Sequence, residues 1–206
     1  MILKEYISGP IEANNYLLVD EETKEGALID CSEMKQEIVD DANALGANIK
    51  YILLTHGHFD HVLGVNEMKK ALGAKVYIHK SDVFMLENIN QIMSLFGMNQ
   101  KVEPPEYDEL VEDGQELPLG NTKIKILHTP GHSEGGVCYL VDDKLFSGDT
   151  LFRESVGRTD LYGGNFKTLL DSVKGVLFNL DDDINVYPGH GPSSTIGHEK
   201  NYNQFI

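Results

Sequence analysis

The sequence predicts an α/β domain in which strands and helices form layers, and three observations support this prediction. Short apolar runs alternate with segments of helical spacing along the chain. The second half of the chain repeats this order more loosely than the first half. At 206 residues, of which 41% are hydrophobic, the chain can bury a sizeable core. Such alternation is typical of layered α/β domains, and we expect a single domain over residues 1–206.

The first half begins with three strands, a helix, a strand, a helix and a strand, predicted at residues 2–7, 15–20, 26–31, 33–46, 49–55, 63–73 and 75–79. Helical spacing then continues over residues 81–96, whereas residues 97–114, with two adjacent prolines, are predicted to be irregular. The second half contains three strands, a helix and a last strand with a turn, predicted at residues 122–132, 135–141, 144–152, 166–178 and 184–191. Periodicity leaves open whether these strands form one sheet or two.

The charge balance argues against several classes of partner. Thirty-three acidic residues against 17 basic ones give a net charge of −16, which repels nucleic acid and anionic membranes. No apolar stretch approaches the roughly 20 residues that a membrane span needs, and the first residues lack the pattern of a secretory signal. We therefore expect a cytoplasmic protein in which Cys31 and Cys138, both within apolar runs, are buried free thiols.

Three histidines and one aspartate lie within six positions, directly after the apolar run of residues 49–55. They are His56, His58, Asp60 and His61. The carboxyl end of a strand is where α/β folds usually place their chemistry. Imidazole and carboxylate together suit Zn²⁺, Fe²⁺ or Mn²⁺ rather than Ca²⁺. Because one ion cannot easily take four ligands from so short a loop, the spacing favours two ions.

Three further apolar runs each end in a glycine followed by a potential ligand. These ligands are His132, Asp149 and His190. Glycine lets the backbone turn sharply and approach another group closely, which suits a strand end that must aim a side chain at an ion. Taken alone, each histidine is more often structural, but together with the first cluster the series indicates a metal centre.

The order His-x-His-x-Asp-His, Gly-His, Gly-Asp and Gly-His resembles the motif of the metallo-β-lactamase-fold hydrolases, over essentially the whole chain. The resemblance implies an αββα sandwich with the metals at one edge. It implies that the first ion is held by His56, His58 and His132. The second ion would then be held by Asp60, His61 and His190, with Asp149 bridging the two.

The segments GDTLFRESVGRTDLYGG and GHGPSSTIGHEKNYNQF further resemble the small glyoxalase II-like (hydroxyacylglutathione hydrolase-like) branch. The chain ends at Ile206, where full glyoxalase II enzymes continue into a helical domain that contacts glutathione, so the resemblance is to a branch without that domain. It implies hydrolysis of a small hydroxyacyl thioester by a metal-bridging hydroxide. We expect two divalent ions, zinc first, with iron or manganese as alternatives. Asp60 would be mainly a ligand, with proton handling as a secondary role.

Weaker signals concern the substrate and the surroundings of the metals. The only two arginines, Arg153 and Arg158, follow Asp149 within nine residues and suggest an anionic small-molecule substrate, although a salt bridge within the loop explains them equally well. Tyr162 is a candidate substrate contact or a core residue. Asp30 is expected to orient a ligand histidine.

The apolar helical stretch within residues 81–98 is either a lid over the site or part of the core, and core is the commoner outcome for such a stripe. Its methionines would suit a lid, because flexible thioether side chains adapt to varied ligands.

Three other functions remain open. A persulfide dioxygenase of the same superfamily would use one iron, with His56, His132 and Asp149 as its ligands. A lactonase or a β-lactamase would use similar metal chemistry in a different pocket. A metal-binding regulatory module without enzymatic activity is the alternative outside enzymes.

Overall fold

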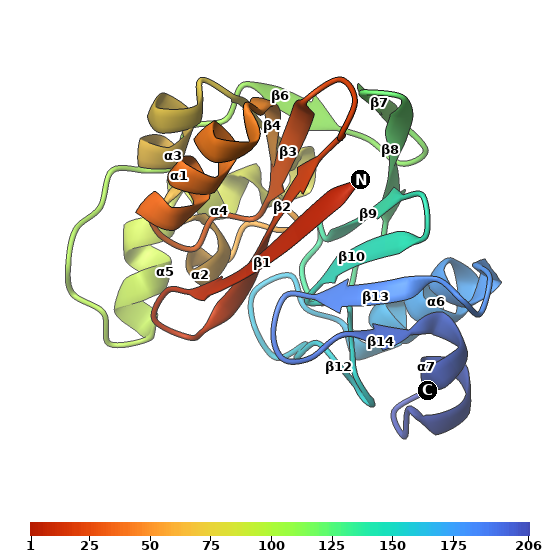
Figure 1. Cartoon of the computed structure of the whole chain (residues 1–206). Helices are drawn as coiled ribbons and strands as arrows, with labels where there is room; N and C mark the ends of the chain where they lie inside the picture. Colours follow the sequence, from red (N-terminus) through yellow and green to blue (C-terminus); the bar gives the residue numbers. More distant parts are fainter.

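Two six-stranded sheets pack against each other at the centre of the computed structural model, which describes residues 1–206 (Figure 1). Helices cover the outer surface of each sheet, so the order of layers is helix, sheet, sheet, helix. The expected αββα arrangement is confirmed, and the strands form two sheets rather than one.

The first sheet contains the six strands of the N-terminal half, in sequence order. They are β1 (Ile2–Ser8), β2 (Ala13–Val19), β3 (Glu25–Ile29), β4 (Asn48–Leu53), β5 (Lys75–His79) and β6 (Glu109–Val111). The first three strands are antiparallel, and β3 to β6 are parallel. Its helices are α1 (Gln36–Leu45), α2 (Phe59–Val62), α3 (Val65–Leu72), α4 (Val83–Glu87) and α5 (Ile89–Leu95), with the 3₁₀ turn η1 (Lys80–Asp82) before α4.

The second sheet has the order β14-β13-β10-β9-β8-β7. Its strands are β7 (Glu116–Leu119), β8 (Thr122–His128), β9 (Val137–Val141), β10 (Lys144–Gly148), β13 (Asn185–Pro188) and β14 (Ser194–Thr195). A small hairpin of β11 (Leu151–Phe152) and β12 (Ser155–Val156) follows β10. The remaining elements are α6 (Phe166–Gly175), the 3₁₀ turn η2 (Leu177–Asn179) and α7 (Ile196–Tyr202).

Alternation along the strands builds the core. In β2, Leu17 and Val19 face the helices of the first layer, whereas Tyr16 and Leu18 face the second sheet. Side chains of a strand point alternately to its two faces, so a strand that is buried on both faces is apolar at nearly every position. Three apolar clusters result, one at each boundary between neighbouring layers.

Two local expectations differ from the structure. The predicted helix over residues 81–96 is divided at Asn88 into α4 and α5, and the Asn88 side-chain amide donates to the Phe84 carbonyl. Within the segment predicted to be irregular, β6 pairs in parallel with β5. Both cysteines are buried and unpaired, as expected. None of the helices has the length and apolar character needed to span a bilayer.

Phe146 lies at the centre of the contact between the sheets. Its fully buried ring packs against Tyr16 and Tyr187, at centroid distances of 5.2 and 5.4 Å. We expect Phe146→Ala to lower the free energy of unfolding by about 3–5 kcal/mol, because it removes apolar contacts and leaves a cavity. Phe205→Ala makes the same chemical change at a side chain that is 51% exposed and is expected to change stability by less than about 0.5 kcal/mol. Urea unfolding measures both, and equal losses would contradict this account of the core.

Candidate metal centre

The histidine cluster occupies the loop and short helix that follow β4. His56, His58, Asp60 and His61 are all buried, although all four side chains carry polar or charged groups that water would solvate well. Asp60 and His61 lie within the helix α2, and His58 is the residue before it. Polar side chains buried in such numbers need partners, which the other strand ends provide.

The other three ligand candidates come from the second sheet. His132 lies in the loop between β8 and β9, Asp149 directly follows β10, and His190 follows β13. Short distances join them to the first cluster: His132 Nε2 lies 2.8 Å from His58 Nδ1, and His190 Nε2 lies 3.1 Å from Asp60 Oδ2. The structure therefore brings together all seven side chains that the sequence singled out as ligands.

Three overlapping groups of these side chains have potential ligand atoms within 4.8 Å of one another. The groups are His56–His58–His132, His56–His61–Asp149 and Asp60–His61–His190. The first and last groups have no member in common, and the middle group takes one residue from each and adds Asp149. Side chains of this kind and number can hold two ions of the zinc, iron or manganese type.

Hydrogen bonds on one ring nitrogen leave the other nitrogen of three histidines free for a metal. The Nδ1 atoms of His132 and His61 lie 2.7 Å from the Arg158 carbonyl and 2.9 Å from Asp30 Oδ2. Since these oxygens only accept hydrogen bonds, each Nδ1 carries the proton and each Nε2 offers a lone pair. His56 Nδ1 lies 3.0 Å from the Thr55 hydroxyl, and its Nε2 faces the cluster.

Two buried atoms of the cluster have no hydrogen-bond partner within the protein, as expected of atoms that bind a metal ion. They are His56 Nε2 and Asp149 Oδ1. A Cβ atom on Gly189 would lie 2.2 Å from Asp149 Oδ1 and 2.8 Å from a ring carbon of His61. Only glycine allows the backbone to pass so close to these groups. The unpartnered atoms and the tight cradle fit a bound cation.

The electrostatics of the cluster also suit a cation. Burial and the neighbouring imidazoles lower the pKa of His56 and of His58, which keeps both rings neutral with lone pairs available. Burial disfavours charge on His61, but nearby carboxylates, Asp60 first, outweigh it and raise its pKa. Burial likewise opposes ionisation of Asp149, yet the adjacent imidazoles, His61 first, hold its pKa well below the usual range.

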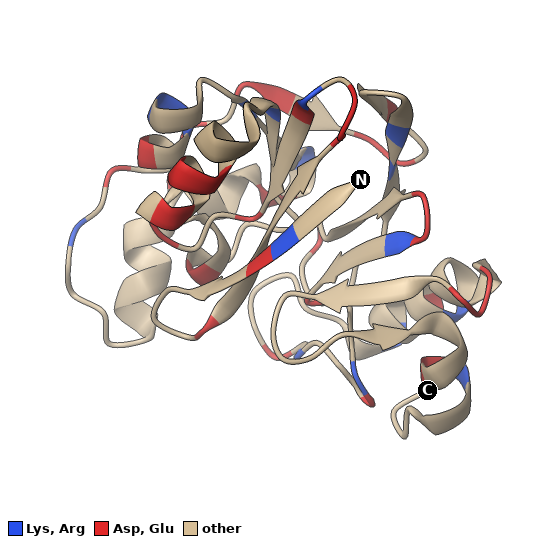
Figure 2. Ribbon diagram, in the orientation of Figure 1, with Lys and Arg blue, Asp and Glu red and all other residues tan.

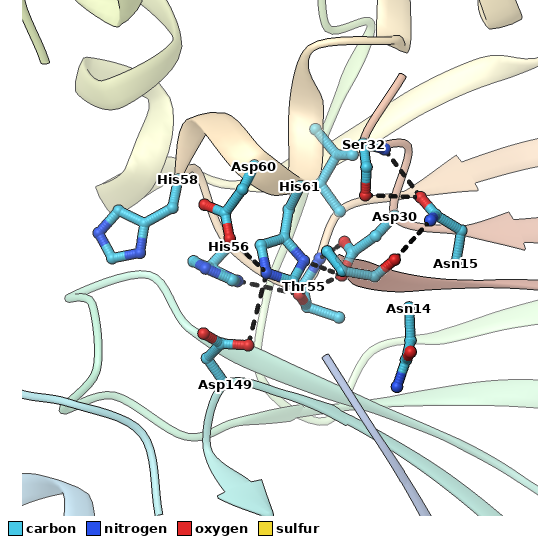
Figure 3. Close-up of polar contacts among 12 residues, drawn as sticks. Asn14, Asn15, Asp30, Ser32, Thr55, His56, His58, Asp60, His61 and Asp149 are labelled. Atoms are coloured by element: carbon cyan, nitrogen blue, oxygen red, sulfur yellow. Dashed lines mark hydrogen bonds and ion pairs between the residues drawn. The ribbon is translucent and has the colours of Figure 1, made fainter. Parts of the chain in front are cut away.

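Asp30 connects the metal cluster to the first sheet (Figure 3). Besides its contact with His61, its carboxylate accepts hydrogen bonds from the backbone N–H and the hydroxyl of Thr55, both at 2.7 Å. Asp30 adopts a φ of 57°, in the left-handed region that L-residues rarely occupy. Asp30 thus contacts the ring of His61, one of the histidines that the sequence singled out as candidate ligands.

Two residues that sequence reasoning missed hold the ligand loops in place. The buried Asp82 carboxylate accepts hydrogen bonds from the Gly57 N–H at 3.0 Å, the Ser133 hydroxyl at 2.7 Å and the Gly135 N–H at 2.6 Å. It thereby joins the loop of His56 and His58 to the loop of His132. The only sequence signal for it is an acidic residue shortly after the end of a strand.

Asn14 performs a similar task for His190. Its backbone N–H donates to the Gly189 carbonyl at 2.7 Å, and its side-chain amide donates to the carbonyls of Pro188 and Gly191. The first sheet thus fixes the turn of the second sheet that carries His190 (Figure 3 shows Asn14 beside the cluster).

A pocket of about 370 Å³ opens beside the cluster and is lined by five of the seven ligand candidates. Arg158 also lines it, but its Nε and Nη2 atoms donate to the two carboxylate oxygens of Asp160, at 2.7 and 2.8 Å. Arg153 is exposed in the turn between β11 and β12 and does not line the pocket. Tyr162 is exposed and packs against Phe84, also outside the lining.

The segment of residues 81–98 combines both of its expected roles. Leu86, Ile89 and Met93 are buried in the first apolar cluster, as core residues are, and Met85 is buried as well. Phe96, at the end of α5, lines the pocket instead and packs on Phe59. The segment is therefore mainly core, with its end forming one wall of the site.

We expect Asp82→Asn to lower the affinity for Zn²⁺ about 10–100-fold, the usual cost of losing a group that positions ligands. Both carboxylate oxygens of Asp82 accept hydrogen bonds, whereas the asparagine side chain has only one accepting oxygen. Its NH₂ group would face an N–H or O–H donor instead. Asp108→Asn is the matched control, because Asp108 accepts hydrogen bonds from Lys69 and Val76 at the beginning of β5, the end of that strand opposite to the ligands. Competition with a chromophoric chelator measures both affinities. Unchanged affinity in a normally folded Asp82→Asn protein would contradict the positioning role.

Comparison with known sequences places the chain in a family. Residues 9–190 match the family model of the metallo-beta-lactamase superfamily. The chain is 36% identical to the probable metallo-hydrolase YqgX of Bacillus subtilis, over 96% of this chain and 94% of that protein. It is 33% identical to the hydroxyacylglutathione hydrolase GloC of Haemophilus influenzae, over 93% of this chain and 92% of that protein.

Solved structures show the same relationship. The BLEG-1 B3 metallo-beta-lactamase is similar with a TM-score of 0.91 at 33% identity, over 99% of both chains. TTHA1623 in a di-iron-bound form has a TM-score of 0.86 at 36% identity, over 98% of this chain and 100% of that one. ETHE1 from Myxococcus xanthus has a TM-score of 0.78 at 27% identity, over 99% of this chain and 84% of that one. With its motif, fold and ligand cluster in agreement, this chain belongs to the metallo-beta-lactamase superfamily of metallo-hydrolases.

Proposed function

We propose that this protein hydrolyses small thioesters of the hydroxyacyl-thiol type with the help of two divalent metal ions. The observation that carries the proposal is the division of seven ligand side chains, five of them buried and two half-buried, into two separate groups with Asp149 between them. A single ion of the zinc type takes four to six ligands, so the set exceeds what one ion needs.

His56, His58 and His132 would hold one ion, and Asp60, His61 and His190 would hold the other. Asp149 lies within 3.5 Å of His132 Nε2 and within 3.4 Å of His61 Nε2, which suits a carboxylate shared by both ions. Zinc is our first choice, and the di-iron form of TTHA1623 supports iron as an alternative. Ions held there would supply Lewis acidity and lower the pKa of a water molecule toward neutrality.

The chain's own residues would orient the reaction. Asp30 and the Arg158 carbonyl fix two ligand rings in the orientation that presents Nε2 to the cluster. Asp60 lines the pocket and lies 3.1 Å from His190 Nε2, so it would act mainly as a ligand. The six apolar side chains of the pocket lining would limit access of water to the bond to be cleaved, which would strengthen electrostatic interactions there.

Similarity to GloC, described as a hydroxyacylglutathione hydrolase, supports thioesters as the substrate class. Similarity to the BLEG-1 B3 metallo-beta-lactamase supports a second candidate, hydrolysis of a lactam ring. Both reactions attack a carbonyl carbon, so the pocket rather than the metal ligands decides between them.

We expect the protein with two ions per chain to hydrolyse hydroxyacyl thioesters, and excess chelator to lower kcat/KM at least 100-fold until metal is restored. Measurement of the released thiol monitors the hydrolysis directly. Activity on lactams or lactones without activity on thioesters would replace the proposed substrate class. One iron per chain, with oxygen consumption on glutathione persulfide, would identify the protein as a dioxygenase instead.

His190→Ala tests the second ion specifically. We expect the metal content to fall from two ions to one and kcat/KM for thioesters to fall at least 100-fold, because the group of Asp60 and His61 loses its third ligand. His198→Ala is the matched control, since His198 pairs with Glu154 outside the ligand cluster, and it should retain both ions. Elemental analysis gives the metal content. Full metal content and activity in His190→Ala would refute the two-ion assignment.

A further inference from the structure

Six of the thirteen residues that line the pocket are hydrophobic, and five of the others are ligand candidates. Apart from ligand candidates, its lining consists mainly of Ile11, Phe59, Phe96, Phe152, Val156 and Leu161. They come from the turn between β1 and β2, from α2, from the end of α5, from the small hairpin and from the loop before α6. Five separate segments thus contribute apolar side chains to one cavity.

The apolar surface continues beyond the mouth of the pocket. Leu95, next to Phe96, is 82% exposed, and Ile11 is 50% exposed. The exposed rings of Phe84 and Tyr162 pack 5.1 Å apart, and Tyr162 follows the lining residue Leu161 in the chain. Residues 88–100 contain no charged side chain, and Figure 2 shows α5 without charge. Exposed apolar patches of this kind commonly mark binding surfaces.

The pocket offers no free basic side chain to a substrate. Arg158 is the only lysine or arginine that lines it, and both carboxylate oxygens of Asp160 already engage its guanidinium. A substrate carboxylate that entered would lose hydration without gaining a cation from these walls. The net charge of −16 also opposes anions at longer range. These contacts remove much of the reason for expecting an anionic substrate.

We propose that the substrate's thiol half is apolar and uncharged, rather than a charged peptide thiol such as glutathione, and that Asp160 enforces this selection by occupying Arg158. The inference rests on the proposed thioester hydrolysis. The carbonyl carbon must reach the ligand cluster, and a small hydroxyacyl group fills little of the cavity. The thiol half therefore lies against the apolar walls. Glutathione would bring two carboxylates and an ammonium group to the same place.

Two substrates with the same acyl group test the inference: S-lactoylglutathione and the lactoyl thioester of benzyl mercaptan. We expect the metal-loaded protein to show a kcat/KM at least tenfold higher for the benzyl thioester. Phe96→Ala should reduce this preference about tenfold, because it removes an apolar wall. Phe205→Ala, at an exposed phenylalanine outside the pocket, should leave the preference unchanged.

Asp160→Asn tests the charge argument separately. Freeing the guanidinium should raise kcat/KM for S-lactoylglutathione about threefold to fivefold, the range expected for an exposed ion pair, and so reduce the preference for the benzyl thioester. Equal or greater efficiency with S-lactoylglutathione in the unmodified protein would overturn the inference and leave thioester hydrolysis intact. No hydrolysis of either thioester would overturn the proposed function and this inference together.

Discussion

Two buried carboxylates that need a cation govern the architecture of this site. Asp60 and Asp149 both lie within 3.4 Å of His61 Nε2, and no lysine or arginine side chain pairs with either of them. Leaving such charges unpaired in a protein interior costs several kcal/mol per ion. The raised pKa of His61 is the response of a protonatable ring to this field. Divalent cations would neutralise the same carboxylates with more positive charge. The lone pairs of the neighbouring imidazoles are already directed toward the place that such cations would occupy.

The fold meets this need by bringing ligand-bearing loops of the two sheets together at one place. Ligand candidates from α2 and from the loop after β4 meet those from the loops that follow β8, β10 and β13. Asp82 and Asn14 then hold these loops together, since each forms hydrogen bonds with backbone groups of loops that contain ligand candidates. The packed interior between the sheets keeps these loops at a fixed separation. The geometry of the candidate metal centre thus depends on sheet packing as well as on the candidate ligands themselves.

Local sequence predicted the ligands because they follow apolar runs, four of them directly after a glycine. The layer order came from the family resemblance, since periodicity alone left one sheet or two open. The roles of Asp82 and Asn14 could not be predicted from local sequence, because their hydrogen-bond partners are distant in the chain. The partners of Asp82 lie 25 to 53 positions away, and Pro188, a partner of Asn14, lies 174 positions away. The break at Asn88 and the three-residue strand β6 likewise depend on tertiary contacts. The apolar pocket walls carry no local mark that separates them from core residues.

Anomalous diffraction from crystals of protein purified without added metal tests the central claim most directly, because it locates each ion and identifies the element. The account predicts two peaks. One should lie among His56, His58 and His132, and the other among Asp60, His61 and His190, with Asp149 touching both. A single peak bound by His56, His132 and Asp149 would contradict the two-ion centre, and the absence of any peak at these side chains would contradict the metal site itself.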